Sequence, residues 1–291
     1  MKHELSILIP TFNDLCEPLV RQICQQADKL AATKFYYEVI VADDASTDFT
    51  IVNSNATISQ IPHCRLIRQE QNIGRSAIRN MLAREASYQW LLFIDGDMRV
   101  RHHNFLEQYI ITPCETVVYG GYELAFVSKR NLRSLYEKSC LSQHTVAQRQ
   151  IKPYKDFHTS NFMVSRHLFL EHPLNEKFRY YGYEDVVWGM MLGKLGVDIC
   201  HIDNPVSFES FESNSSFMKK TEEALCTLHQ FCDMLKDDSK LITMADLLKF
   251  MKYPLSWIFD LLAPSMRRSL CGSRPSLWMF NLYRLGFFLS L

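Results

Sequence analysis

The first hundred residues alternate between short apolar runs and amphipathic segments, and this alternation constrains the fold more than any other feature. Apolar, β-branched runs predict strands at residues 5–10, 37–42, 64–67 and 90–94. Helical spacing predicts helices at 15–31 and 72–86. Near-continuous apolar runs are typical of strands covered on both faces. The pattern therefore predicts an α/β fold built on a doubly wound, mostly parallel sheet.

Beyond residue 100 the pattern is more mixed. It predicts strands at 117–119, 161–165 and 197–202, and helices at 131–150 and 184–195. From about residue 214 the chain is expected to be helical.

Composition excludes several classes of protein. Of the 291 residues, 47% are hydrophobic and the formal net charge is zero, so neither a disordered chain nor an electrostatically driven nucleic-acid binder is expected. The nine cysteines contain no CxxC pair, which indicates reduced thiols rather than a disulfide framework or zinc site. We find no signal peptide and no run of about 20 uncharged apolar residues, and we therefore expect a cytoplasmic protein.

The predicted strands end in polar residues that should share one edge of the sheet. In parallel α/β sheets, ligands bind beyond the carboxyl ends of the strands. Those ends hold Pro10, Thr11, Asp44 and the turn Asp95-Gly96-Asp97. Two carboxylates on alternate residues of a tight turn can reach one Mg²⁺ or Mn²⁺ ion that also binds phosphates. The alternative is a solvated turn.

The acids after the second strand have two interpretations. Asp44 could accept hydrogen bonds from a base or ribose, or an acid here could cap the next helix. Asp48 fits the cap, and Ser46 and Thr47 are also candidate caps.

Arg75 and Arg79 lie four residues apart on one predicted helix face, near its start. That position suits contact with a phosphate or a uracil carbonyl. The alternative is a solvated face that pairs with Glu70 or Glu85.

Glu184 and Asp185 open a predicted helix, where one carboxylate could act as a general base. Acids in a first helical turn also interact with the helix dipole, so a purely structural role is the alternative. His201 follows an apolar strand and is either a buried structural histidine or a metal ligand.

Seven stretches, SILIPTFND, EVIVADDASTD, NIGRSAIRN, WLLFIDGDMRV, TSNFMVSR, GYEDVVWGMML and HIDNPVSFES, occur in this order over about residues 4–225. Together they resemble glycosyltransferase family 2, bacterial-type, with a GT-A fold. The resemblance implies inverting transfer of a sugar, hexosyl or related, from a nucleotide diphosphate donor to an acceptor hydroxyl. A UDP-linked donor and a role in cell-surface glycan or polysaccharide assembly are expected.

The resemblance also implies roles for individual residues. Pro10, Thr11 and Asp44 would contact the nucleotide, with Asp44 at the base. Arg75 and Arg79 would flank the base.

The DxD motif corresponds to Asp95 and Asp97. Asp97 is expected at the metal, and Asp95 at the ribose or the metal, which would be Mn²⁺ or Mg²⁺. Asp185 matches the family's base, and Glu184 would support it or bind the acceptor.

The sequence departs from the family pattern at two positions. Ala45 stands where glycine is usual, and Phe208 stands where related bacterial sequences often have histidine. Since Phe208 cannot bind a metal, His201 or water would complete the metal shell.

By this resemblance we expect a catalytic domain over 1–225, with a nucleotide-binding half at 1–100 and an acceptor and catalytic half at 101–225. A helical C-terminal region would follow at 226–291. Residues 245–291 hold six basic and two acidic residues, a net charge of +4, among Trp, Phe, Leu and Met.

Such a composition suits helices at a membrane interface, and the segment 277–291 is too short to span a bilayer. We expect peripheral contact with the inner face of the cytoplasmic membrane and a glycan or lipid-linked acceptor. A helical subdomain or an oligomer interface is the alternative.

Other functions fit the sequence less well. A sugar nucleotidyltransferase would need a glycine-rich, basic first loop, whereas residues 10–18 contain neither glycine nor a basic residue. A dehydrogenase would need GxGxxG after the first strand, and this motif is missing. An inactive sugar-nucleotide-binding scaffold stays as a further alternative, against which Asp44, Asp97 and Asp185 argue.

Overall fold

The computed structural model describes residues 1–31, 34–155 and 157–291. The chain forms two compact units, each built from separate stretches of sequence. The α/β unit comprises Met1–Ala125, Gln143–Arg179 and Glu184–Glu209. The helical unit comprises Phe126–Ser142, Tyr180–Tyr183 and Ser210–Leu291.

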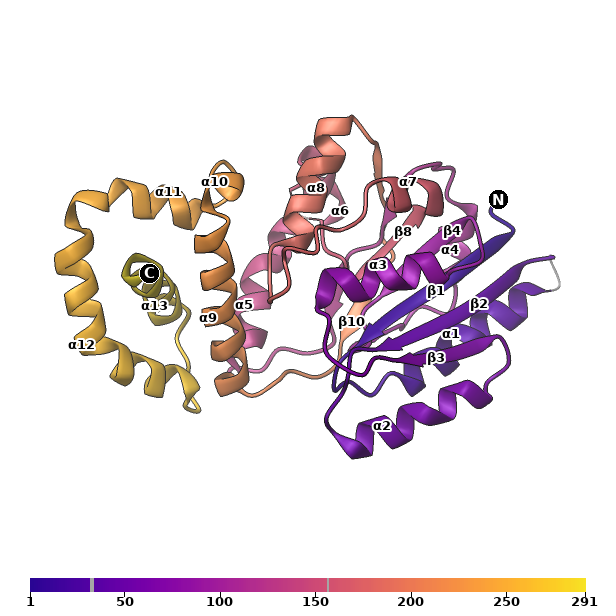
Figure 1. Cartoon of the computed structure of the whole chain (residues 1–291), viewed down its shortest axis with the longest axis horizontal. Helices are drawn as coiled ribbons and strands as arrows, with labels where there is room; N and C mark the ends of the chain where they lie inside the picture. Colours follow the sequence, from indigo (N-terminus) through magenta and orange to yellow (C-terminus); the bar gives the residue numbers. More distant parts are fainter. Residues whose placement is uncertain (32–33, 156) are drawn as a thin grey trace. The chain divides into compact units, whose positions relative to one another are not determined.

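A seven-stranded sheet forms the centre of the α/β unit, with the strand order β3-β2-β1-β4-β8-β6-β9 (Figure 1). Its strands are β1 (Glu4–Thr11), β2 (Tyr36–Asp43), β3 (Cys64–Arg68), β4 (Trp90–Ile94), β6 (Val117–Tyr119), β8 (Asn161–Ser165) and β9 (Ile199–His201). β8 is antiparallel to both its neighbours, and the other pairs are parallel. The predicted mostly parallel α/β sheet is therefore confirmed.

Helices cover both faces of this sheet. They are α1 (Glu17–Leu30), α2 (Phe49–Ala56), α3 (Arg75–Glu85), α4 (Phe105–Ile111), α6 (Val146–Ile151), α7 (Arg166–Glu171) and α8 (Glu184–Leu195), with the 3₁₀ turn η2 (Thr57–Gln60). In Figure 1, α3 lies in front of the sheet and α1 behind it. Ile7, Leu8 and Ile9 of β1 are consequently all buried. This two-sided burial explains why the strands are continuously apolar.

A second, three-stranded sheet lies within the same unit and was not predicted. It pairs β5 (Met98–Arg99), β10 (Val206–Phe208) and β7 (Tyr122–Leu124) in the order β5-β10-β7. Each of these short strands contains a polar residue (Arg99, Glu123 or Ser207), so none forms the continuous apolar run by which the three-residue strand β6 was recognised. The register places Phe208 opposite Met98, the residue after Asp97.

Two local predictions were wrong. The helix expected at 131–150 is divided into α5 (Leu132–Cys140), the 3₁₀ turn η3 (Leu141–Gln143) and α6, because α5 and α6 belong to different units and Thr145 caps α6. Ser46 and Thr47 do not cap α2, because Ser46 and the Thr47 amide bond to Asn13. The Asp48 carboxylate accepts from the amides of Thr50 and Ile51, which confirms Asp48 as the cap.

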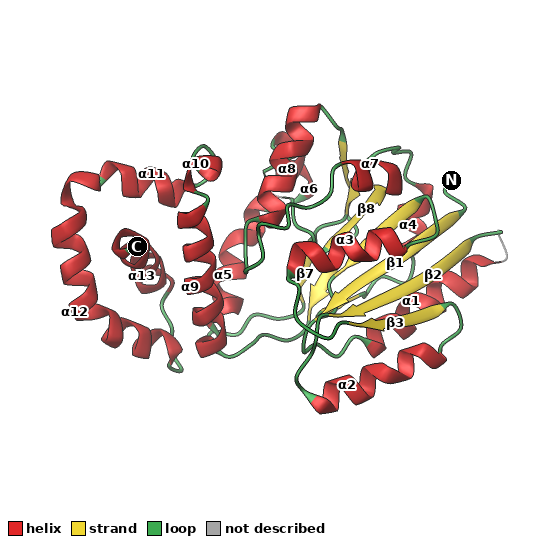
Figure 2. Ribbon diagram, in the orientation of Figure 1, coloured by secondary structure: helices red, strands yellow, loops and turns green. Residues whose placement is uncertain are grey.

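The helical unit is arranged around α13 (Figure 2). Besides α5 and α13 (Leu277–Ser290), it contains α9 (Asn214–Gln230), α10 (Cys232–Leu235), α11 (Lys240–Leu247), η4 (Lys249–Met251) and α12 (Lys252–Cys271). Its core joins Leu132 of α5 to Phe217, Phe259 and Phe280. No helix in the described part of the chain is both long and apolar enough to cross a membrane.

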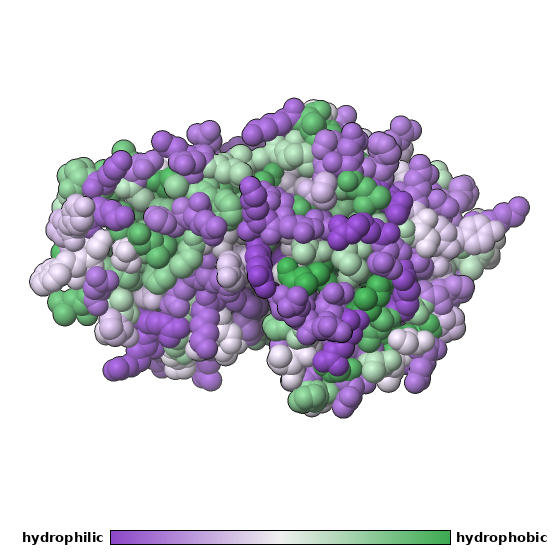
Figure 3. All heavy atoms as spheres, viewed as in Figure 1, coloured by the Kyte–Doolittle hydropathy of each residue, from purple (hydrophilic) through white to green (hydrophobic). Residues whose placement is uncertain are grey.

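The helical unit also exposes large apolar side chains. Phe250 is 82% exposed, Tyr253 86%, and Trp257 and Leu261 are each 70% exposed. In Figure 3, pale and green spheres interrupt the hydrophilic purple on the left, over the helical unit. We call the four residues Phe250, Tyr253, Trp257 and Leu261 the apolar stripe.

Candidate active site

Three strand ends meet at one edge of the main sheet. The Asp44 amide, just after β2, donates to the Thr11 carbonyl at the end of β1 (2.9 Å). The Gly96 amide, after β4, donates to the Pro10 carbonyl (3.2 Å). A Cβ atom on Gly96 would lie 3.1 Å from Cβ of Thr11, so any larger residue would require Thr11 to move by a few tenths of an ångström. The edge expected from parallel strands is therefore present.

Asp44 anchors the start of α3. Its carboxylate accepts from the amides of Ile73 (2.8 Å) and Gly74 (3.1 Å). Gly74 has φ of +94°, and a Cβ atom there would lie 2.7 Å from the Arg179 carbonyl oxygen. Burial raises the pKa of Asp44, although the two amide hydrogen bonds oppose that rise. The Asp44 carboxylate thus binds the start of α3, which follows β3, rather than the start of α2, which follows Asp44 directly in sequence.

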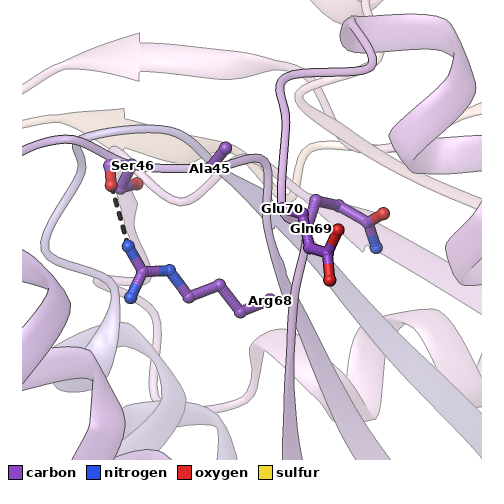
Figure 4. Close-up of a pocket in the computed structure, with 5 residues that line it drawn as sticks. All are labelled: Ala45, Ser46, Arg68, Gln69 and Glu70. Atoms are coloured by element: carbon purple, nitrogen blue, oxygen red, sulfur yellow. Dashed lines mark hydrogen bonds between the residues drawn. The ribbon is translucent and has the colours of Figure 1, made fainter.

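A hollow of about 520 Å³ lies beside Asp44. Figure 4 shows its lining, which consists of Ala45, Ser46, Arg68, Gln69 and Glu70. Arg68 donates to the Ser46 carbonyl (3.2 Å) and so fixes one wall. Ala45 has φ of +63°, a conformation that glycine adopts more easily, which explains physically why glycine is usual here in the family that the sequence resembles.

Arg75 and Arg79 hold acids from two other elements. Arg79 is only 2% exposed and its Nη2 donates to Asp95, while Arg75 approaches Asp95 at 3.7 Å. Arg75 Nε also donates to Glu184 of α8 (2.8 Å). The interpretation of this pair as a solvated face is wrong for Arg79, and Glu85 pairs with Arg65 instead. Two arginines of α3 therefore join the DxD turn to α8.

Glu184 and Asp185 differ in their surroundings. Glu184 is 3% exposed, and its Oε2 has no hydrogen-bond partner among the described residues. The Asp185 carboxylate contacts His158 Nδ1 (3.0 Å) and accepts from the Val186 amide (2.8 Å). Burial raises the pKa of Asp185, but the His158 hydrogen bond and charge, the Val186 amide and Arg75 outweigh burial and lower it. Asp185 is thus held as a carboxylate able to accept a proton.

Sequence reasoning missed His158. It precedes β8, and because β8 is antiparallel to β4, the start of β8 lies at the same edge as the end of β4. The Asp95 amide accordingly donates to the Ser160 carbonyl (3.1 Å). The strand-end rule, extended to the beginnings of antiparallel strands, would have indicated this histidine.

The residues at the DxD turn suit a cation that binds few protein ligands. Asp97 is exposed at the turn, whereas both arginines of α3 engage Asp95. Mg²⁺ usually binds one or two carboxylates and completes its coordination shell with water and phosphates. The carboxylates of Asp95 and Asp97 are compatible with this preference. Across residues 1–31, 34–155 and 157–291, no three His, Cys, Asp or Glu side chains are grouped to hold a metal ion.

His201 lies in β9, an edge strand of the main sheet. Its Nε2 is 3.1 Å from the Pro153 carbonyl oxygen, and its ring meets Tyr119 edge-on. The metal role of His201 stays a prediction. Phe208 packs against Tyr122 beside the DxD turn.

Other proteins of known structure share this architecture. The mannosyltransferase PcManGT from Pyrobaculum calidifontis, solved with GDP-Man and Mn²⁺, superposes with a TM-score of 0.57 at 15% identity, over 98% of this chain and 84% of that chain. S. aureus TarS gives a TM-score of 0.51 at 14% identity, over 97% of this chain and 54% of that one. These likenesses show the fold, and the expected GT-A-like architecture is confirmed.

Sequence comparisons agree. An uncharacterized glycosyltransferase of Haemophilus influenzae is 34% identical over 95 residues, which span 32% of this chain and 29% of that protein. The family model described as glycosyl transferase family 2 matches residues 6–183. The chain therefore belongs to glycosyl transferase family 2.

Proposed function

We propose that the protein transfers a sugar, with inversion, from a nucleoside diphosphate sugar to a hydroxyl group of a glycan or lipid-linked acceptor. One observation carries the proposal: acids from separate parts of the chain are joined through α3. Asp44 binds the start of this helix, and Arg75 and Arg79 connect it to Asp95 and Glu184. Asp185 follows Glu184 directly.

The donor would lie along the edge where these strands end. Pro10, Thr11 and Asp44 would contact the nucleoside, beside the hollow lined by Ala45 and Arg68. The Asp44 carboxylate can accept a hydrogen bond from a ring N–H, which uracil and guanine both offer. Of the two, we propose uracil, so that the donor is a UDP-sugar. PcManGT, of similar fold, binds GDP-Man and Mn²⁺. Arg75 and Arg79 add positive charge close to the expected diphosphate.

In this mechanism Asp185 removes the proton of the acceptor hydroxyl. The oxygen then attacks the anomeric carbon opposite the diphosphate, whose bond to the sugar breaks and which leaves with the electron pair. Asp97, with Asp95 as its neighbour, would hold a Mg²⁺ or Mn²⁺ ion, which neutralises charge on the diphosphate when bound. Since one displacement inverts the anomeric centre, a single protein base is sufficient.

The Asp185→Asn variant tests this mechanism. We expect a loss of transfer of about 10²–10⁴-fold, because a general base contributes that much. Binding of UDP in the presence of Mn²⁺, measured by calorimetry, should persist. The Phe49→Ser variant, which changes an exposed side chain on α2, serves as control and should transfer normally.

UDP-sugars and GDP-mannose would be compared as donors, with formation of the glycosidic product as the readout. Full transfer by Asp185→Asn contradicts the assignment of the base. A wild-type protein that binds donors but neither transfers nor hydrolyses them is the inactive scaffold. Formation of a nucleotide sugar from a nucleoside triphosphate and a sugar phosphate would indicate a nucleotidyltransferase.

We propose further that the apolar stripe rests on the anionic inner surface of the cytoplasmic membrane. Tyr253, Trp257 and Leu261 recur every four residues on the face of α12 opposite the buried Phe259. An ordinary surface helix is polar on this face. Aromatic side chains with nearby basic residues suit the interfacial region of a bilayer. Each basic residue near an anionic surface strengthens the free energy of membrane binding by about 1 kcal/mol.

Vesicle flotation of the full chain tests this placement. On phosphatidylcholine vesicles with about 30% phosphatidylglycerol, we expect the double variant Trp257→Ser/Leu261→Ser to bind at least about tenfold more weakly than wild type. Phe49→Ser is the matched control. Equal binding by wild type and the double variant contradicts the proposal, as does a stripe-dependent dimer in light scattering with no vesicle binding.

A further inference from the structure

The structure assigns a role to His158: we propose that it is a positioning residue, whose Nδ1–H holds the Asp185 carboxylate in the direction required for proton removal. The inference rests on the proposed function, because Asp185 is the base only if the protein transfers a sugar to a hydroxyl group. It names a residue to which nothing in the sequence motifs gives a role.

The contact itself is specific. His158 Nδ1 lies 3.0 Å from Asp185 Oδ2, and the Val186 amide donates to Oδ1 at 2.8 Å. Each carboxylate oxygen therefore has a fixed donor and keeps a lone pair for the acceptor hydroxyl. With both oxygens held, the carboxylate cannot rotate freely, so its direction is fixed before the acceptor binds.

Two neighbouring rings hold the imidazole in this orientation. The centroid of Tyr122, on β7, lies 5.6 Å from that of His158, and the two rings are nearly perpendicular. The His144 ring is 5.2 Å away and is itself 5.1 Å from Tyr122. Phe208 supports Tyr122 edge-on at 5.5 Å. Phe208, at the position where a histidine is often found, thus belongs to the packing behind the base.

The geometry distinguishes between two possible roles in a His–Asp pair. In a Ser–His–Asp triad the aspartate also bonds Nδ1, and Nε2 of the imidazole acts as the base. The His158 side chain as a whole is 35% exposed, but its Nε2 atom is buried, so the exposed part of the ring is not the nitrogen that would have to act as the base. The side chain of Asp185 is 19% exposed. The carboxylate is therefore the base, and the imidazole orients it.

Charged groups on several elements also act on Asp185. Arg75 of α3 and His158 both favour its carboxylate form, and burial opposes them. Glu184 precedes it on α8, and the rings of His144 and Tyr122 lie next to that of His158. Without the His158 donor, burial has less opposition, and the pKa of Asp185 should rise.

Two substitutions separate positioning from packing. His158→Ala removes the donor, whereas His158→Asn places an amide N–H close to the former Nδ1. We expect His158→Ala to lower kcat by about 10–100-fold, as loss of orienting partners does elsewhere, with the donor KM nearly unchanged. The acidic limb of its pH–rate profile should move to higher pH. His158→Asn should recover most of kcat and return the limb toward the wild-type position.

His167→Ala is the matched control, because His167 forms a 3.6 Å pair with Glu171 on the exposed face of α7. It should leave kcat and the pH profile unchanged. A second readout does not require transfer: ¹³C NMR of the Asp185 carboxyl group in the donor-free protein. Its titration should move to higher pH in His158→Ala and back in His158→Asn.

Each outcome decides the matter. Unchanged kcat and an unchanged carboxyl titration in His158→Ala overturn the inference, as does equal loss in the Ala and Asn variants. Should His158→Ala fail to fold, His158→Phe, which fills the place of the ring but offers no donor, should show the same loss of kcat and the same shift of the carboxyl titration, and wild-type values in that variant would overturn the inference. If the wild type transfers no sugar but the titration shifts as expected, the proposed function fails while the His158–Asp185 contact stands.

Discussion

Leu8 and Leu261 show how differently the two units use apolar side chains. Leu8 lies in β1 with 0% exposure, packed between the sheet and α3, whereas Leu261 is 70% exposed on α12. In the α/β unit, charged groups gather at strand ends and engage one another, as Arg79 and Asp95 do. Buried apolar side chains stabilise both units, and the helical unit in addition exposes several of them along one face of α12.

Substituting these two leucines should give the largest contrast. We expect Leu8→Ala to lower the free energy of unfolding by about 3–4 kcal/mol, because it leaves a cavity in a packed core. Leu261→Ala should change it by less than about 0.5 kcal/mol, since the side chain lies mostly in solvent. Chemical denaturation followed by circular dichroism measures both. Similar losses would mean that the stripe packs against something within the chain.

A somewhat smaller effect is expected from Arg79→Met. Arg79 is buried, and its removal leaves Asp95 without its closest cation, which should cost about 3 kcal/mol. Arg65→Met is the control, because Arg65 and Glu85 form an exposed pair at 2.9 Å that should contribute less than about 1 kcal/mol. The same denaturation experiment applies, and equal costs would refute the assigned importance of burial.

The smallest expected effect is the loss of stability at low pH that depends on single carboxyl groups, and it should have the same sign in both units. Burial raises the pKa of Asp185 and of Glu212, but His158 acts on the former, and Lys220 and Arg133 on the latter, so that each pKa is lowered. A carboxyl group whose pKa is lowered by folding stabilises the protein above its ordinary pKa of about 4, and this contribution is lost as the pH falls through the folded-state pKa.

Between about pH 6 and pH 3, the free energy of unfolding should therefore fall less steeply in Asp185→Asn and in Glu212→Gln than in the wild type. Over this range, the total fall in each variant should be smaller than that of the wild type by less than about 1 kcal/mol. Urea unfolding at a series of pH values gives the slopes. Curves parallel to the wild type would show that neither carboxyl group is stabilised by folding.

Much of the site could be predicted because it depends on strand ends. The apolar runs locate β1, β2 and β4, and the direction of parallel strands then brings Thr11, Asp44 and Asp95 to one edge. Local signals decided less. Asn13, from a different loop, donates its amide N–H to the Ser46 hydroxyl and accepts from the Thr47 amide, and the residue that caps α2 is Asp48.

The rest depends on tertiary contacts that leave little trace in sequence. His158 contacts Asp185 from 27 positions away, and it lies at this edge of the sheet because β8 runs antiparallel to β4. The three-stranded sheet uses strands of two or three residues that each include a polar side chain, so they form no apolar run in the sequence. The apolar stripe was expected only as a composition, since whether Trp257 is buried or exposed depends on which face of α12 meets the core.

The helical unit draws on three stretches of the chain, and the chain passes back into the α/β unit between them. Leu132, from the earliest stretch, shares a core with Phe217 and Phe280 from the last. Deletion of the C-terminal residues would consequently strand α5 without its packing partners. An exchange of this unit between proteins would therefore have to carry all three stretches together, since no single continuous segment contains its core.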